Sequence, residues 1–140
     1  MHCSGKYRLA LKTPKDQIIN IEYTRDKSKK KAAYKKSKAI NLKSDIDSIY
    51  TSTEKAARWY KASVSSTKKR KAVTLSKDSV GGGFKFCVYQ KGKRLKTVKV
   101  TKNDKVKTVK LPKKKGAYYV KVTKLTSKTT GAYYLGTYTY

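Results

Sequence analysis

The chain has 140 residues, enough for one domain with one core, and its 37 Lys and Arg against 8 Asp and Glu give a net charge of +29. No apolar run approaches the roughly 18 residues of a transmembrane helix, and the single histidine, His2, argues against imidazole catalysis and multi-histidine metal sites. Ile, Leu, Val and Phe supply only 26 of the 140 residues, a composition typical of disorder at this charge, but 12 Tyr and 15 Thr favour strands and predict a folded domain.

The first third of the chain carries little of the patterning of a folded domain. A β-branched run over residues 17–23 predicts one strand. Residues 25–38 are dense in lysine and show no apolar stripe with a period of 3.6 residues, so we expect a charged loop or linker there. We therefore divide the chain into a basic N-terminal lead-in, 1–36, and a domain, 37–140.

Short runs of alternating apolar and polar residues follow in the domain, separated by turns rich in Gly, Asn, Asp and Lys. Such runs are typical of strands that bury one face. Short strands at this spacing, with no long helix, predict an all-β fold, an antiparallel sandwich or barrel. The residues that mark the runs are Tyr60, Ala62, Val64, Val73, Leu75, Phe84, Phe86, Val88, Val98, Val100, Val106, Val109, Leu111, Tyr118, Val120, Val122, Tyr133 and Leu135.

The two cysteines, Cys3 and Cys87, have a spacing that fits no zinc or redox motif. Cys87 falls within an alternating run, which favours an inert side chain in a sheet. Whether the two cysteines pair depends on a distance that only the fold sets, so the sequence leaves a disulfide open.

The sequence offers no constellation for catalysis. No serine lies in a nucleophile elbow with a histidine to serve as its base. The three glycines at 81–83 lack the Lys-Ser/Thr that completes a phosphate loop, and the eight acidic residues are scattered. We expect a protein that is not an enzyme and has no cofactor and no metal.

The order of the runs resembles that of a bacterial family, the pre-peptidase C-terminal domain. Residues 57–62 correspond to the family's first strand and residues 86–95 to a middle hairpin. The closest match is to the pattern of Leu, loop, G-x-Y-Y-x-x-V, loop, G-x-Y-x-L, which here spans residues 111–135. The resemblance covers residues 40–140 and implies a β-sandwich of jelly-roll type.

The same resemblance implies an extracellular accessory domain, often appended to secreted peptidases, without catalysis of its own. Some relatives bind collagen or other matrix polymers, and some bind calcium through carboxylates near the domain start. This chain departs from the calcium pattern, because Arg58 stands where the family has Asp and only Asp45, Asp47 and Glu54 lie near the domain entry. Calcium needs six to eight oxygen ligands, so these acids favour a role as turn residues.

Tyrosine is the most distinctive side chain of the C-terminal runs. If Tyr118 and Tyr133 face the core, their neighbours face solvent, and the last two strands would show a row of tyrosines beside lysines. Exposed aromatics among cations suit stacking on sugars or bases and also suit protein contacts; the alternative is cross-strand pairing that only stabilises the sheet. The predicted ligand-binding residues are Lys85, Tyr119, Lys121, Tyr134 and Tyr138.

Lys outnumbers Arg by 32 to 5, which favours diffuse attraction to a polyanion over the planar recognition that Arg provides. We therefore expect a secreted or cell-surface domain, without a signal peptide in this chain, that binds an anionic or matrix polymer such as a polysaccharide, a cell-wall polymer or a collagen-like protein. One alternative is a self-assembling surface protein, a homo-oligomer whose N-terminal strand pairs with a neighbour's sheet edge. A second alternative is a nucleic-acid-binding protein, and a third is that the charge only keeps the protein soluble.

Overall fold

The computed structural model describes residues 33–42, 46–50 and 57–140. The strand predicted over 17–23 and Cys3 lie outside these residues. No described helix is long and apolar enough to cross a membrane.

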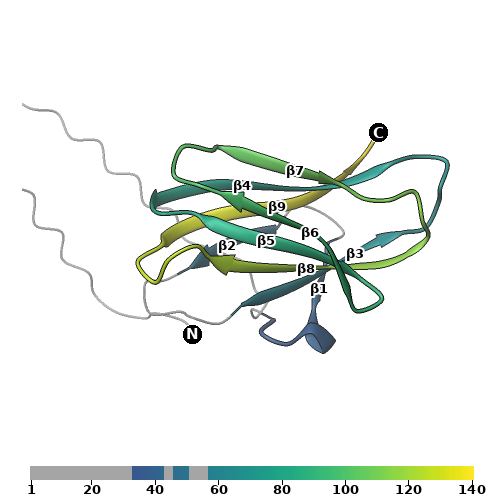
Figure 1. Cartoon of the computed structure of the whole chain (residues 1–140), viewed down its shortest axis with the longest axis horizontal. Coiled ribbons are helices and arrows are strands. Elements are labelled where there is room, and N and C mark those ends of the chain that lie inside the picture. The colour runs from purple at the N-terminus through teal and green to yellow at the C-terminus, as the bar shows by residue number, and fades with distance from the viewer. Residues whose placement is uncertain (1–32, 43–45, 51–56) are drawn as a thin grey trace, which may run out of the picture.

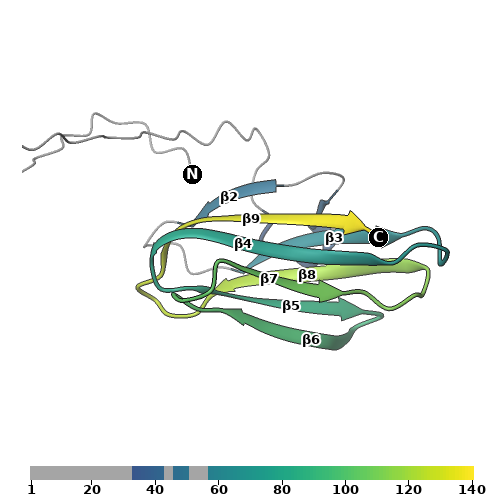
Figure 2. The same cartoon turned by 90° about the horizontal axis from the view of Figure 1, so that it is seen from above.

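The described residues form nine strands in two packed sheets (Figures 1 and 2). All neighbouring strands run antiparallel except the strands Ile40–Asn41 and Arg58–Val64, which run parallel to each other. The predicted β-sandwich is therefore confirmed. In spatial order, the five-stranded sheet is β1 (Ile40–Asn41), β3 (Arg58–Val64), β8 (Gly116–Lys124), β5 (Phe84–Gln90) and β6 (Lys93–Val100), and the four-stranded sheet is β2 (Ile46–Tyr50), β9 (Thr130–Thr139), β4 (Lys71–Gly81) and β7 (Val106–Lys110).

The core lies between the sheets and is built from every second residue of the strands, as the alternation predicted. Tyr118 and Tyr133 are fully buried, which confirms their predicted inward orientation. Tyr60 and Tyr133 come from opposite sheets and meet edge-on with ring centroids 6.4 Å apart. Their hydroxyls hydrogen-bond to each other, so the centre of an apolar core contains a polar link between the sheets.

The start of the described chain packs on the edge of the five-stranded sheet. The Ala33 carbonyl accepts a hydrogen bond from the Trp59 N–H at 2.8 Å, and the Ala33 side chain is buried. A three-residue 3-10 turn, Lys36–Lys38, then leads into β1. Residues 33–36, which the sequence assigned to the lead-in, thus contact the domain.

Among the described strands, only the β5–β6 connection stays within one sheet, because every other pair of consecutive strands is divided between the two sheets. Figures 1 and 2 show the resulting loops gathered at the two ends of the sandwich. One end carries the β3–β4, β5–β6 and β7–β8 loops, and the other carries the β4–β5, β6–β7 and β8–β9 loops.

Candidate functional site at one end of the sandwich

Three loops that are distant in the sequence converge at one end of the molecule. Val64, the last residue of β3, is in register with Gly116, the first residue of β8, so the loops after β3 and before β8 lie side by side. The Leu111 N–H donates to the Lys71 carbonyl at 2.8 Å, which joins the same two loops a second time. A Cβ placed on Gly116 would lie 3.6 Å from Gln90 Nε2, and this brings in the β5–β6 turn.

These loops, residues 65–71, 90–94 and 112–116, are here called the cationic end. They contain no Asp or Glu. Asp104 is the acidic residue whose side chain the structure describes, and it lies in the β6–β7 loop at the opposite end of the sandwich. The cationic end has ten basic residues, and all are exposed except Lys71, which is half-buried. They are Lys68, Lys69, Arg70, Lys71, Lys91, Lys93, Arg94, Lys113, Lys114 and Lys115. The end therefore presents a concentrated positive potential that no acidic side chain within these loops neutralises.

A shallow cavity of about 320 Å³ opens within the cationic end. Its lining combines ammonium groups with hydroxyls, because Val64, Ser65, Ser66, Lys68, Lys69, Lys71 and Thr139 surround it. Cations and hydroxyl donors together match the oxygens of a sulfate, phosphate or carboxylate group.

Backbone and side-chain hydrogen bonds hold this loop in place. The N–H of Arg70 donates to the Tyr140 carbonyl and the N–H of Tyr140 to the Arg70 carbonyl, both at 2.9 Å. Lys71 Nζ donates to the Ser63 carbonyl at 2.8 Å, and the Lys68 N–H donates to Ser66 Oγ at 3.1 Å. The cations of the β3–β4 loop thus extend from a fixed backbone.

Tyr118 fixes the second loop of the cationic end from within the core. Its ring is fully buried, while its hydroxyl donates to the carbonyl oxygens of Lys114 at 2.9 Å and Pro112 at 3.3 Å. Burial raises the pKa of the Tyr118 hydroxyl, against a smaller lowering by a hydrogen bond with Gln90. The hydroxyl therefore remains a neutral donor at physiological pH and holds residues 113–115 at the surface.

The five predicted ligand-binding residues do not lie on one surface. Lys85, Tyr119 and Lys121 extend from β5 and β8 on the outer face of the five-stranded sheet, whereas Tyr134 and Tyr138 extend from β9 on the outer face of the four-stranded sheet. The predicted continuous tyrosine row across the last two strands is therefore wrong. The β8–β9 connection passes from one sheet to the other, and the outer faces of a sandwich point in opposite directions.

Cations and aromatic rings do interleave on the outer face of the five-stranded sheet. Trp59 and Tyr89 lie with ring centroids 5.6 Å apart, and Lys121 Nζ lies 5.5 Å from the Trp59 ring. Lys36 Nζ lies 4.7 Å from the centre of the Tyr119 ring. The Trp59 and Tyr119 rings therefore already make cation–π contacts within the protein itself, and these contacts stabilise this face of the sheet.

The same face contains Cys87. Its side chain is nearly covered, and its Sγ lies 3.4 Å from Thr97 Oγ1. Neighbouring Tyr89 has its pKa raised, chiefly by desolvation on burial and then by Cys87. Among the described residues no three His, Cys, Asp or Glu side chains cluster as metal ligands would.

We did not predict the cationic end from the sequence, although the basic runs that form it are visible there. The basic runs 68–71 and 113–115 are among the densest in the domain. They are 42 or more residues apart, and they become neighbours only through the pairing of β3 with β8 and of β4 with β7. A charge run taken alone favours a solvated loop, so charge density without the topology does not identify a site.

Comparison with known proteins gives one line of evidence, which concerns the fold. No protein-family model matches the sequence, and no curated protein matches it either. The structure is similar to that of the pre-peptidase C-terminal domain of a collagenase from Bacillus anthracis, with a TM-score of 0.54 and 18% sequence identity, over 71% of this chain and 92% of that one. The chain therefore has the β-sandwich fold of a pre-peptidase C-terminal domain.

Proposed function

We propose that this protein is a non-catalytic cell-surface module that binds an anionic polymer through its cationic end. The observation that carries the proposal is the convergence of three loops whose ten basic residues have no acidic neighbour within those loops. Folding them together costs electrostatic free energy, which a bound polyanion would recover by neutralising the charge.

The composition of the cationic end indicates the class of polymer. Eight of its ten cations are Lys and two are Arg, so most of the attraction comes from point charges rather than from planar forks. The reading of base edges usually relies on bidentate Arg contacts. A sulfated or carboxylated polysaccharide, or a phosphate-bearing wall polymer, fits the site better than a specific nucleic-acid sequence does.

Removal of three charges from the cationic end tests this proposal. The variant carries Lys68→Gln, Lys69→Gln and Arg70→Gln, all at exposed positions. A cation beside an anionic surface contributes about 1 kcal/mol, so we expect the dissociation constant for a heparin oligosaccharide to rise by at least about tenfold at 0.1 M salt. The slope of log K against log salt should fall by about 2, because fewer counterions are released.

The matched control removes three exposed charges from the opposite end, with Lys102→Gln, Lys105→Gln and Lys128→Gln. It has the same net charge as the first variant, and we expect its affinity to change by less than about threefold. Equal losses in the two variants would contradict a localised site and leave only general charge attraction. Tighter binding of a DNA duplex of equal charge would assign nucleic acid as the partner instead.

A further inference from the structure

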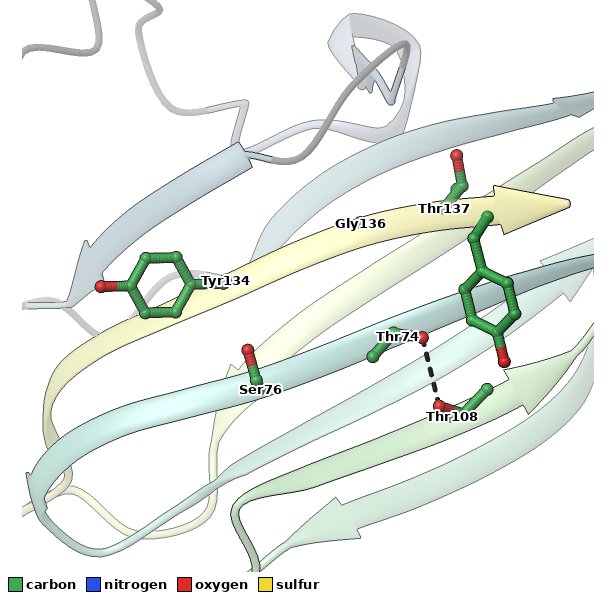
Figure 3. Close-up of a pocket in the computed structure, with 7 residues that line it drawn as sticks. Thr74, Ser76, Thr108, Tyr134, Gly136 and Thr137 are labelled. Carbon is green, nitrogen blue, oxygen red and sulfur yellow. Dashed lines mark hydrogen bonds between the residues drawn. The ribbon is translucent and has the colours of Figure 1, made fainter.

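A second surface of this molecule differs in chemistry from the cationic end. A groove of about 370 Å³ crosses the outer face of the four-stranded sheet (Figure 3). It is here called the neutral groove, and its lining residues are Thr74, Ser76, Thr108, Tyr134, Gly136, Thr137 and Tyr138.

Register explains the shape of the neutral groove. Gly136 on β9 is in register with Thr74 on β4, which is in register with Thr108 on β7, so these three residues form one row across the sheet. Because Gly136 has no side chain, the surface along this row is lowest where the row crosses β9. Tyr134 and Tyr138 rise from β9 on either side of Gly136, four residues and about 13 Å apart along the strand.

The walls and floor of the groove offer two kinds of contact. Tyr134 and Tyr138 are 40% and 46% exposed, so part of each ring is available to a ligand. Thr74 Oγ1 and Thr108 Oγ1 lie 3.1 Å apart in the floor and share one hydrogen bond, which leaves acceptor capacity on both oxygens. Tyr140 packs beside Tyr138, with ring centroids 5.6 Å apart, and supports it from outside the groove.

None of the seven lining residues is charged, although 37 of the 140 residues are Lys or Arg. Lys110 on β7 is in register with Ala72 beside Tyr138, but it does not line the groove, and its Nζ lies 5.6 Å from the Tyr140 ring. A polyanion gains nothing from such a lining. A second copy of the chain is opposed by its own charge of +29.

We propose that the neutral groove binds an uncharged polyhydroxylated chain, a neutral oligosaccharide, with sugar rings against Tyr134 and Tyr138 and sugar hydroxyls on Thr74, Thr108 and Ser76. Aromatic faces take up the apolar C–H side of a sugar ring, and hydroxyls donate and accept hydrogen bonds as sugar hydroxyls do. This site is separate from the cationic end and does not depend on the function proposed there.

The test titrates the full chain with cellohexaose, chitohexaose and maltohexaose and follows backbone amide signals by NMR. We expect at least one of these to bind and to shift the amide signals of Thr74, Thr108 and Gly136, with an affinity that is unchanged between 0.05 and about 0.5 M salt because no counterions are released. Tyr134→Ala and Tyr138→Ala should each weaken binding by about tenfold or more. Tyr34→Ala, which removes a tyrosine of similar exposure before β1, should leave it unchanged.

Folding of each variant is checked by its thermal unfolding transition. The triple variant of the cationic end should keep full affinity for the neutral sugar, which separates this site from the one proposed above. The inference is overturned if none of the three sugars binds at millimolar concentration, or if binding survives in Tyr134→Ala. It is also overturned if light scattering shows that Tyr134→Ala dissociates a dimer, since a second copy would then be the occupant of the groove.

Discussion

The hydroxyl pair of Tyr60 and Tyr133 is a fully buried polar contact between the two sheets. Both side chains are at most 1% exposed, and the Phe84 ring packs on Tyr133 with centroids 5.0 Å apart. A pair of buried hydroxyls that bond across the core fixes how one sheet sits on the other, because a shifted sheet would leave both groups in apolar surroundings.

A double-mutant cycle measures this link. We expect Tyr60→Phe and Tyr133→Phe each to lower the free energy of unfolding by about 1 kcal/mol, and the two together to cost less than their sum by about 0.5–1.5 kcal/mol. Urea unfolding of the four proteins gives the coupling. Strictly additive losses would show that the two hydroxyls are stabilised by other partners and do not act as a pair.

Asp104 is the residue whose charge state the structure most clearly couples to folding. Its Oδ1 accepts from Lys107 Nζ at 2.7 Å, and its Oδ2 accepts from the N–H and the hydroxyl of Thr101 at 2.9 and 2.7 Å. Lys107 first, and then Thr101, hold the pKa of the Asp104 carboxyl well below its usual value of 3.8.

A lowered pKa means that the folded state releases this proton more readily than the unfolded state does. The stabilisation is therefore complete above the unfolded pKa near 3.8 and is lost as the pH falls from there through the folded pKa. Asp104→Asn removes the charge, so the variant should unfold at lower urea concentration than the wild type at pH 7. The difference should shrink progressively between about pH 4 and pH 2; a difference that is constant over that range would show that the ionised carboxyl is not what stabilises the turn.

At the scale of the elements, two glycines in neighbouring turns have different physical roles. Gly83 lies between β4 and β5, and a Cβ there would lie 2.0 Å from the Val100 carbonyl oxygen, a backbone atom that cannot move aside. Gly92 in the β5–β6 turn has a φ of +80°, but a Cβ there would meet nothing within 4 Å. Position 83 requires glycine because two loops approach each other closely there. Position 92 favours glycine only because its backbone φ is positive.

This distinction predicts different costs for the same substitution. Gly92→Ala should lower the free energy of unfolding by about 1–2 kcal/mol, the cost of a left-handed conformation for an L-residue. Gly83→Ala should cost more than about 3 kcal/mol, because the β4–β5 and β6–β7 loops must separate. Thermal or urea unfolding checks both, and equal costs would contradict the tight packing at that end.

The elements also show how far the sequence predicts this fold. Alternation placed Tyr118, Val120 and Val122 on the inner face of a strand, and all three are fully buried, because a period of two is a local property of the chain. The short strands β1 and β2 were not predicted, since the two residues of β1 carry too little pattern and the apolar residues of β2, Ile46, Ile49 and Tyr50, do not alternate. Division of the strands between the sheets was also out of reach, because it depends on contacts between distant segments.

That division accounts for what the site prediction missed. Alternation correctly turned Tyr119 and Tyr134 outward, but it contains no information on which sheet each strand joins. The two tyrosines consequently belong to opposite faces, one with cation–π contacts and one beside a neutral groove. The cationic end arises in the same way, from loops that become neighbours only through the strand order.

At the scale of the whole molecule, charge is distributed unevenly over a sandwich of simple shape. The loops at one end hold ten cations and no acid, whereas the groove on the four-stranded sheet is lined by no charge at all. If the positive charge served solubility alone, it would be spread over all exposed surfaces with no reason to spare one groove or to crowd one end. This asymmetry is the central argument that the protein binds a polyanion at a defined place.

The measurement that tests this claim most directly is a map of amide chemical shifts in the full chain during titration with a heparin oligosaccharide at 0.15 M salt. The account predicts that the largest changes fall in residues 65–71, 90–94 and 112–116, and that the amide signals of Thr74, Thr108 and Gly136 do not move. Changes spread evenly over all lysine-bearing strands, or concentrated around Lys85 and Lys121 on the outer face of the five-stranded sheet, would contradict a binding site at the cationic end.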